Sequence, residues 1–298
     1  MPSYCKTPLK KILEDKEKAI YIKDETKQVT GAFKYRGVYH KINQTDSFGY
    51  KGIITASTGN HGAAVALVSK ERNIPCIVVV PENTPDCKTK NILSQGARIV
   101  SKGFTSYEQC KRYAIALSEK NRLLYISSFD DDLIIDGHKT LFAESTEQMQ
   151  FDYCFCPVGG GGLVSAAIRH QKGLGKIIGV EWEKYPVMKK SLAEGRRIML
   201  SCEDDYENIC EGIVVSQVGK LPFEQAMEYD LQIQSVSSNE IVNAISLLKQ
   251  YGIESEGAGA AALAAALSAA VRGKILCVVS GGNIDQNLLE KIAERENI

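Results

Sequence analysis

The segment CFCPVGGGGLVSAAI (residues 154–168) is the part of the sequence that most strongly indicates a fold. An apolar run of strand character enters four consecutive glycines, Gly159 to Gly162, and a helix-forming run follows. Four ordered glycines lose much conformational entropy, which a plain structural turn does not justify. Backbone amides at the first turn of a helix, together with the helix dipole, favour a bound phosphate. The segment therefore predicts a buried strand, a phosphate-binding turn and a helix.

The same alternation of apolar runs and helical segments continues on both sides of this junction. The runs are apolar throughout, which is typical of strands covered by helices on both faces. Expected strands lie at 52–57, 76–81, 97–101, 123–127, 153–158, 176–181 and 274–280. Expected helices lie at 61–72, 86–95, 105–120, 161–171, 239–250 and 257–271. The pattern predicts an α/β fold with parallel-type sheets.

Charge and cysteine usage argue against several classes of protein. The 298 residues include 36 basic and 36 acidic side chains, so no net field attracts nucleic acid or an anionic membrane. No window approaches the roughly 20 apolar residues of a membrane span, and charges run through the first twenty residues where a signal peptide would be apolar. Nine scattered cysteines without CxxC spacing indicate free thiols, including Cys154 and Cys156 on one strand face. We expect a cytoplasmic protein without a metal site.

Two more strand ends lead into turns that suit a ligand. STGNHG (57–62) follows an expected strand, and ligands bind at the carboxyl ends of strands in open α/β sheets. Thr58 and Asn60 offer side-chain hydrogen bonds there, although an N-cap turn explains the segment equally well, and His61 reads as a packing residue. SGGN (280–283) places a hydroxyl at the end of another strand, which is weak evidence by itself.

TGAFKYRG (30–37) sets one lysine, Lys34, in a confined segment behind Phe33. Packing beside an aromatic ring would help depress the pKa of its amine, and such an amine condenses with an aldehyde to a Schiff base. A pyridine aldehyde phosphate would use this lysine, the glycine turn, the Asn/Thr turn and the strand-end hydroxyl together. The four segments thus point to one cofactor.

These four motifs, in this order, resemble those of the fold-type II pyridoxal-phosphate enzymes, and specifically of the serine/threonine dehydratase and serine racemase group. The similarity runs from KTPL (6–9) to SGGN, nearly the whole chain. It implies a tryptophan synthase β-like fold of two domains. Residues 1–49 and 131–298 would form the large, cofactor-binding domain, and residues 50–130 the small, substrate-binding domain. A homodimer is also implied.

The resemblance assigns roles to individual residues. Lys34 would bond the cofactor aldehyde and then take the α-proton of the substrate, with Thr58 as a second catalytic residue. The residues that would bind the cofactor are Phe33, Lys34, Asn60, Gly159, Gly160, Gly161, Gly162 and Ser280. The residues that would bind the substrate carboxylate are Ser57, Thr58, Gly59, Asn60 and His61. A serine at the ring nitrogen makes the cofactor a weaker electron sink, which favours rapid β-elimination.

The implied reaction is the dehydration and deamination of a small L-β-hydroxy amino acid, such as L-threonine or L-serine, to a 2-oxo acid and ammonia. β-Replacement and racemisation on the same cofactor are the alternatives, and a catalytically idle homologue that only binds an amino acid is a third.

Departures from the family pattern bear on this choice. Thr58 stands where racemases of the group carry serine, and Val187 stands where the second carboxylate of a cation site is expected beside Glu181. DGHKTLFAE (136–144) differs from the usual AGQGTIALE, and SSF (127–129) from HPF. Glu256 either faces the cofactor or only complements a helix dipole. These changes suggest a specialised substrate and no tight cation site.

Overall fold

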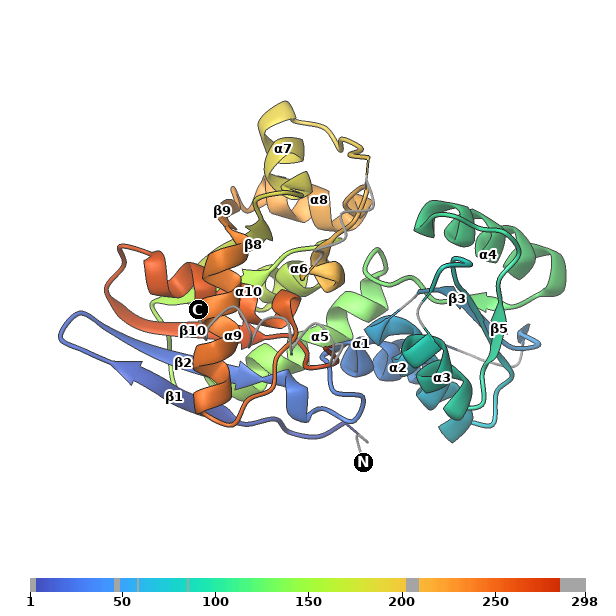
Figure 1. Ribbon diagram of the computed structural model, residues 1–298, viewed down its shortest axis with the longest axis horizontal. Coiled ribbons are helices and arrows are strands. Elements are labelled where there is room, and N and C mark those ends of the chain that lie inside the picture. Colours follow the sequence, from blue (N-terminus) through green and yellow to red (C-terminus); the bar gives the residue numbers. More distant parts are fainter. Residues whose placement is uncertain (1–3, 46–48, 58, 85, 202–208, 285–298) are drawn as a thin grey trace.

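The structure is a computed structural model that describes residues 4–45, 49–57, 59–84, 86–201 and 209–284. Two sheets organise the chain (Figure 1). The larger has the order β1 (Leu9–Glu14), β2 (Lys18–Asp24), β10 (Gly273–Val279), β7 (Tyr153–Pro157), β8 (Lys176–Trp182) and β9 (Gln232–Val236). The smaller has the order β5 (Arg98–Val100), β4 (Cys76–Val79), β3 (Ile53–Ala56) and β6 (Leu124–Tyr125). All pairs are parallel except β1 with β2, so the expected α/β class is confirmed.

The antiparallel pair β1–β2 and the edge strand β9 are absent from the strands expected from sequence. β1 (LKKILE) and β2 (KAIYIKD) mix charged with apolar residues, and the end of β2 carries Lys23 and Asp24, which are completely buried. A charged residue usually signals exposure, so these runs did not resemble covered strands. The charge of Lys23 is paired inside the protein, which is what permits its burial.

Helices cover both sheets. Those expected from sequence are α2 (Asn60–Glu71), α3 (Asp86–Ser94), α4 (Tyr107–Asn121), α6 (Gly162–His170), α9 (Ser238–Gln250) and α10 (Gly257–Ser268). Those not expected are α1 (Lys34–Gln44), α5 (Asp132–Thr146), α7 (Val187–Glu194) and α8 (Lys220–Glu228). α1 and α5 pack against each other, and Figure 1 shows them between the two sheets, where they connect the two halves of the molecule.

Cys154 and Cys156 are buried on one face of a strand, as the sequence predicted. Both are completely buried on the same side of β7, and both are free. Burial raises the pKa of each thiol, so both stay protonated and act as apolar core groups.

No helix in the described part of the chain is long and apolar enough to cross a membrane. The division into domains at 50 and 130 stays a prediction; the smaller sheet lies within that range.

Candidate active site

Lys34 is the first residue of α1 and sits beside the carboxyl end of the central strand β10. The backbone N–H of Phe33 donates to the carbonyl of Ser280 at 3.0 Å, and Ala32 forms a β-bridge with Gly281. These backbone contacts tie the TGAFKYRG segment directly to the SGGN segment. The two motifs are 246 residues apart from Lys34 to Ser280, and the sheet order, with β10 next to β2, is what brings them together.

The amine of Lys34 is held inside the protein. Its Nζ donates to the carbonyl oxygen of Ser128 at 2.8 Å and lies 4.9 Å from the centroid of the Phe33 ring. Burial lowers the pKa of Lys34 to about 8, and the nearby carboxylate of Glu256 opposes this shift by favouring the ammonium form. An amine with this pKa is partly neutral near physiological pH, and only the neutral form is nucleophilic.

The four glycines form a tightly packed turn between β7 and α6. A Cβ atom at Gly160 would lie 2.2 Å from the ring of Phe129, and one at Gly161 would lie 2.6 Å from Pro222. Gly161 also has a φ of 93°, a conformation that residues with a side chain rarely adopt. The turn therefore excludes side chains and presents backbone alone.

The start of α6 has no side-chain cap. Gly161 is its N-cap residue and provides no side-chain hydrogen bond to the first-turn amides. The first four N–H groups of a helix have no partner within the helix, and they favour a phosphate when no side chain caps them. The strand, glycine turn and helix follow one another as the sequence indicated, and the phosphate-binding role of the turn stays a prediction.

Asn60 and Glu256 belong to a chain of side-chain hydrogen bonds. Nδ2 of Asn60 donates to Oε1 of Glu256 at 2.8 Å, and Oδ1 of Asn60 accepts from Nδ2 of Asn283 at 2.7 Å. Nδ2 of Asn283 also donates to the carbonyl of Thr30 at 2.8 Å. Glu256 occupies the N-cap position of α10 without capping it by its side chain, so the carboxylate faces Asn60 and the Lys34 amine instead. Sequence reasoning missed Asn283, although it ends the SGGN motif.

The loop after β3 uses its own side chains to hold its shape. Oγ of Ser57 accepts from the backbone N–H of Gly62 at 3.0 Å and of Gly59 at 3.3 Å. His61 is buried, its Nε2 lies 3.3 Å from the carbonyl of Ile126, and burial together with the charge of Lys34 lowers its pKa to about 3. Thr58 lies outside the described residues. The loop lies close to the segment that carries Lys34, because a Cβ atom at Gly281 would lie 3.0 Å from Cβ of Ala32 and 3.2 Å from Nδ2 of Asn60.

Glu181, which stands where relatives carry one carboxylate of a cation site, caps the start of α7 with its side chain. Its carboxylate accepts from the backbone N–H groups of Met188 and Lys189 at 2.7 and 2.9 Å, at the start of α7. Burial raises the pKa of Glu181 to about 7 despite these bonds. Among the residues that the structure describes, no group of three or more His, Cys, Asp or Glu side chains is placed to hold a metal ion.

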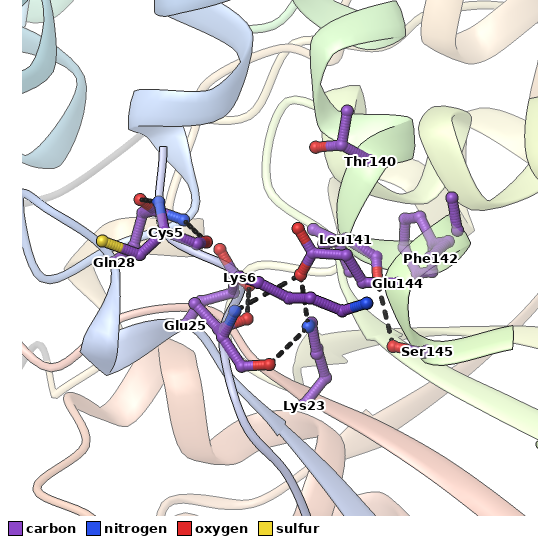
Figure 2. A network of polar contacts seen from close by, with 12 residues as sticks. Cys5, Lys6, Lys23, Glu25, Gln28, Thr140, Leu141, Phe142, Glu144 and Ser145 are labelled. Carbon is purple, nitrogen blue, oxygen red and sulfur yellow. Dashed lines mark hydrogen bonds and ion pairs between the residues drawn. The ribbon is translucent and has the colours of Figure 1, made fainter. Parts of the chain in front are cut away.

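Four charged side chains form a buried network that includes Arg36 of α1, and sequence reasoning missed this network. Arg36, two residues after Lys34, donates to both oxygens of Glu25 at 2.8 and 2.9 Å and to both oxygens of Glu144 at 2.6 and 2.9 Å. Lys23 donates to Glu144 at 2.6 Å. Figure 2 shows Lys23, Glu25 and Glu144 turned toward one another. The network joins α1 to β2, to the 3₁₀ turn 25–27 and to α5.

The described residues fit pyridoxal phosphate. A side-chain-free turn at a helix N-terminus suits the phosphate, and a buried amine with a lowered pKa suits the aldehyde. Ser280 directly follows β10, and Asn60 begins α2 after β3, so both polar side chains lie near carboxyl ends of strands. The arrangement supports the cofactor that the motifs predicted.

Comparison with known proteins agrees with this geometry. The chain is 35% identical over 284 residues to L-threonine ammonia-lyase of Thermotoga maritima, covering 93% of this chain and 70% of that protein. It superposes on the processed form of threonine deaminase isoform 2 from Solanum lycopersicum with a TM-score of 0.89 and 32% identity, covering 99% and 89% of the two chains. Maize serine racemase gives a TM-score of 0.88 at 28% identity, covering 99% and 94%. The model of the pyridoxal-phosphate dependent enzyme family matches residues 1–281, and the chain therefore belongs to this family.

Proposed function

We propose that the protein is an ammonia-lyase that converts a small L-β-hydroxy amino acid, such as L-threonine or L-serine, to a 2-oxo acid and ammonia. The observation that carries the proposal is the buried amine of Lys34, with a pKa of about 8, which donates to the carbonyl of Ser128, while the next residue, Phe129, packs on the glycine turn at the start of α6. The similarity to L-threonine ammonia-lyase supports the choice of reaction.

The cofactor, when bound, supplies an electron sink for the pair left behind when the α-proton is removed. Gly159 to Gly162 would hold its phosphate through backbone amides, and Asn60 and Ser280 would contact its ring. Lys34 would bond its aldehyde, and in its free amine form would accept the α-proton of the substrate. The β-hydroxyl leaves as one molecule of water, and hydrolysis of the released enamine consumes another. The net products are therefore the 2-oxo acid and ammonia.

The substrate carboxylate would be bound by the loop from Ser57 to His61, at the helix N-terminus of α2. Because the Ser57 hydroxyl already accepts two backbone N–H groups, we expect backbone amides of the loop to make most of the contact with the carboxylate. Thr58 would contribute its hydroxyl near the substrate. Residues 50–130 would form the small domain that carries this loop.

We also propose a cytoplasmic homodimer. The seven cysteines whose side chains the structure describes are free, which is typical of a reducing compartment. The homodimer follows from the family resemblance, and light scattering during size-exclusion chromatography tests it.

A product screen tests the reaction. Holoenzyme is mixed with L- and D-serine, L-threonine, allo-threonine, 3-hydroxyaspartate and O-acylated or O-phosphorylated serines. Release of 2-oxo acid and its loss in Lys34→Ala are expected for a free β-hydroxy amino acid. Reaction of activated serines alone, with product formed only after a thiol or amine is added, would indicate β-replacement. Interconversion of the enantiomers of serine without 2-oxo acid would indicate a racemase.

A further inference from the structure

His138 lies on α5 and faces the start of α1, where Phe33 and Lys34 lie. Its side chain is completely buried, and its ring centroid lies 4.6 Å from that of Phe33, with the ring planes inclined by 59°. The Phe33 ring in turn lies 4.9 Å from Nζ of Lys34. The imidazole, the phenyl ring and the amine therefore form a contact series that ends at the atom that would react.

Two glycines bring the helices close enough for this contact. A Cβ atom at Gly137 would lie 2.7 Å from Cα of Gly37, and one at Gly37 would lie 2.4 Å from Cε1 of His138. α1 and α5 thus meet backbone to backbone, and the edge of the imidazole rests on Gly37. The His138 ring has little room to move, so it fixes the surface against which Phe33 packs.

The imidazole is an unfavourable choice for a purely structural position. Among the described residues, neither Nδ1 nor Nε2 of His138 has a hydrogen-bond partner. A buried polar atom without a partner destabilises a fold, and leucine has a similar volume without that penalty. Residues that reduce stability are expected mainly where function requires them. His138 contacts Phe33, which in turn contacts Lys34, and this location agrees with such a requirement.

The groups that face His138 keep it uncharged. Burial, followed by the charges of Lys34, His61, Arg36 and His40, lowers its pKa well below the ordinary value. A neutral ring can pack on Phe33 without repelling the ammonium form of Lys34. Protonation of the ring would place a second positive charge next to that amine.

We propose that His138 is a positioning residue that acts through Phe33 to orient the Lys34 amine. This inference rests on the proposed function, because it assigns the amine the role of proton acceptor. When the Phe33 ring is held in place by His138, it limits the positions open to the Lys34 amine. The amine then points toward the carbonyl of Ser128, to which it donates a hydrogen bond. Small misplacements of a reacting group reduce rates strongly, so the effect is expected in kcat.

The test uses His138→Leu, which keeps the volume and removes the two unpartnered nitrogens. In the holoenzyme we expect kcat to fall about tenfold with KM unchanged. In the apoprotein we expect Tm to equal or exceed that of the wild type, and the rate of covalent capture of pyridoxal phosphate to fall by a similar factor. The matched control is Phe151→Leu, which removes another buried ring contact, with Tyr21, and should lower Tm without changing kcat or capture.

A double-mutant cycle tests the route through Phe33. If His138 acts through that ring, Phe33→Leu with His138→Leu should be no slower than Phe33→Leu alone. Independent, multiplicative effects would overturn the route. Unchanged kcat and capture in His138→Leu, or a lower Tm with those rates unchanged, would overturn the proposal itself.

Two measurements distinguish failure of the proposed function from failure of the positioning role. If the wild-type holoenzyme releases no 2-oxo acid from any amino acid of the screen, the proposed function fails; if Lys34→Ala releases it at the wild-type rate, the role of Lys34 and with it the positioning role of His138 fail. If Lys34→Ala is inactive while His138→Leu retains wild-type rates, only the positioning role of His138 is wrong.

Discussion

Asn60 and Glu256 meet by a hydrogen bond of 2.8 Å between Nδ2 and Oε1, although 196 residues separate them in the chain. The contact joins the loop after β3 to the start of α10, and so joins the smaller sheet to the larger one next to Lys34. Glu256 also favours the ammonium form of Lys34 by its charge. One carboxylate therefore affects both the shape of the site and the proton affinity of its amine.

Glu256→Gln should shift the pH dependence of cofactor capture to lower pH. The amide keeps an oxygen that accepts from Asn60 but removes the negative charge that raises the pKa of Lys34. In the wild type, capture should increase with pH through about 8, because only the neutral amine attacks an aldehyde. The growth of the visible absorption band after mixing apoprotein with pyridoxal phosphate, measured across pH, checks this. Glu254→Gln, at an exposed position two residues earlier, should leave the profile unchanged.

Lys34→Met should stabilise the apoprotein at pH 7, and the gain should fade at higher pH. The pKa of Lys34 is about 8 in the folded protein and 10.5 ordinarily, so the unfolded chain binds more protons between these values. Wild-type stability from this group is thus lowest below pH 8 and rises toward pH 10.5. Urea unfolding of both proteins at several pH values measures the difference. Lys70→Met, on the surface, should show no such pH-dependent gain, and a constant gain for Lys34→Met would contradict the assigned pKa.

Gly161→Ala should weaken cofactor binding at least tenfold. The new Cβ would lie 2.6 Å from Pro222, in a residue with a φ of 93°, so the turn must move. Gly195→Ala is the matched control, since Gly195 has a φ of 64° with no atom within 4 Å of the added Cβ. The control should lose about 1 kcal/mol of stability from the backbone alone and keep wild-type affinity. Equal losses of affinity in both variants would show that the glycine turn has no special role.

Arg36→Met should lower the free energy of unfolding by about 3–5 kcal/mol, because Glu25 stays buried and loses its cationic partner while Glu144 keeps only Lys23. Arg272→Met removes an ion pair with Glu17 whose side chains are 80% and 62% exposed, and should cost less than about 0.5 kcal/mol. Chemical denaturation measures both. A small effect of Arg36→Met would mean that Glu25 and Glu144 are not anions in the folded protein.

The sequence predicted the parts of the fold that obey simple periodicity. The glycine turn, the β7 strand with its two inward thiols and the parallel sheets follow from local rules about apolar runs and backbone amides. β2 did not, because Lys23 is buried with an ionic partner, Glu144, that lies far away in the chain. α1 was missed because Gly31 precedes it and Gly37 lies in its first turn; Gly31 has a φ of 71° and faces Asn283, but Gly37 serves the contact with α5.

For the site, the motifs placed Lys34, Asn60 and Ser280 correctly near one another, but their individual roles stay predictions. Ser128 could not be foreseen, since it contributes a carbonyl oxygen, which every residue has. Arg36 stood in the quoted motif, yet Glu144 meets it only when α5 packs on α1, and Glu25 only when the turn after β2 packs beside α1. Pairing between distant charges leaves no local signal in a sequence.

The position of β10 has a consequence for biosynthesis. β10 lies between β2 and β7 and is the last of the described strands to leave the ribosome. Until it emerges, β2 has no neighbour on that side, and the Phe33 N–H lacks its carbonyl acceptor on Ser280. Such high contact order delays folding of this sheet until β10 has been synthesised. Capture of the coloured cofactor by a nascent chain would therefore report that synthesis has passed residue 280.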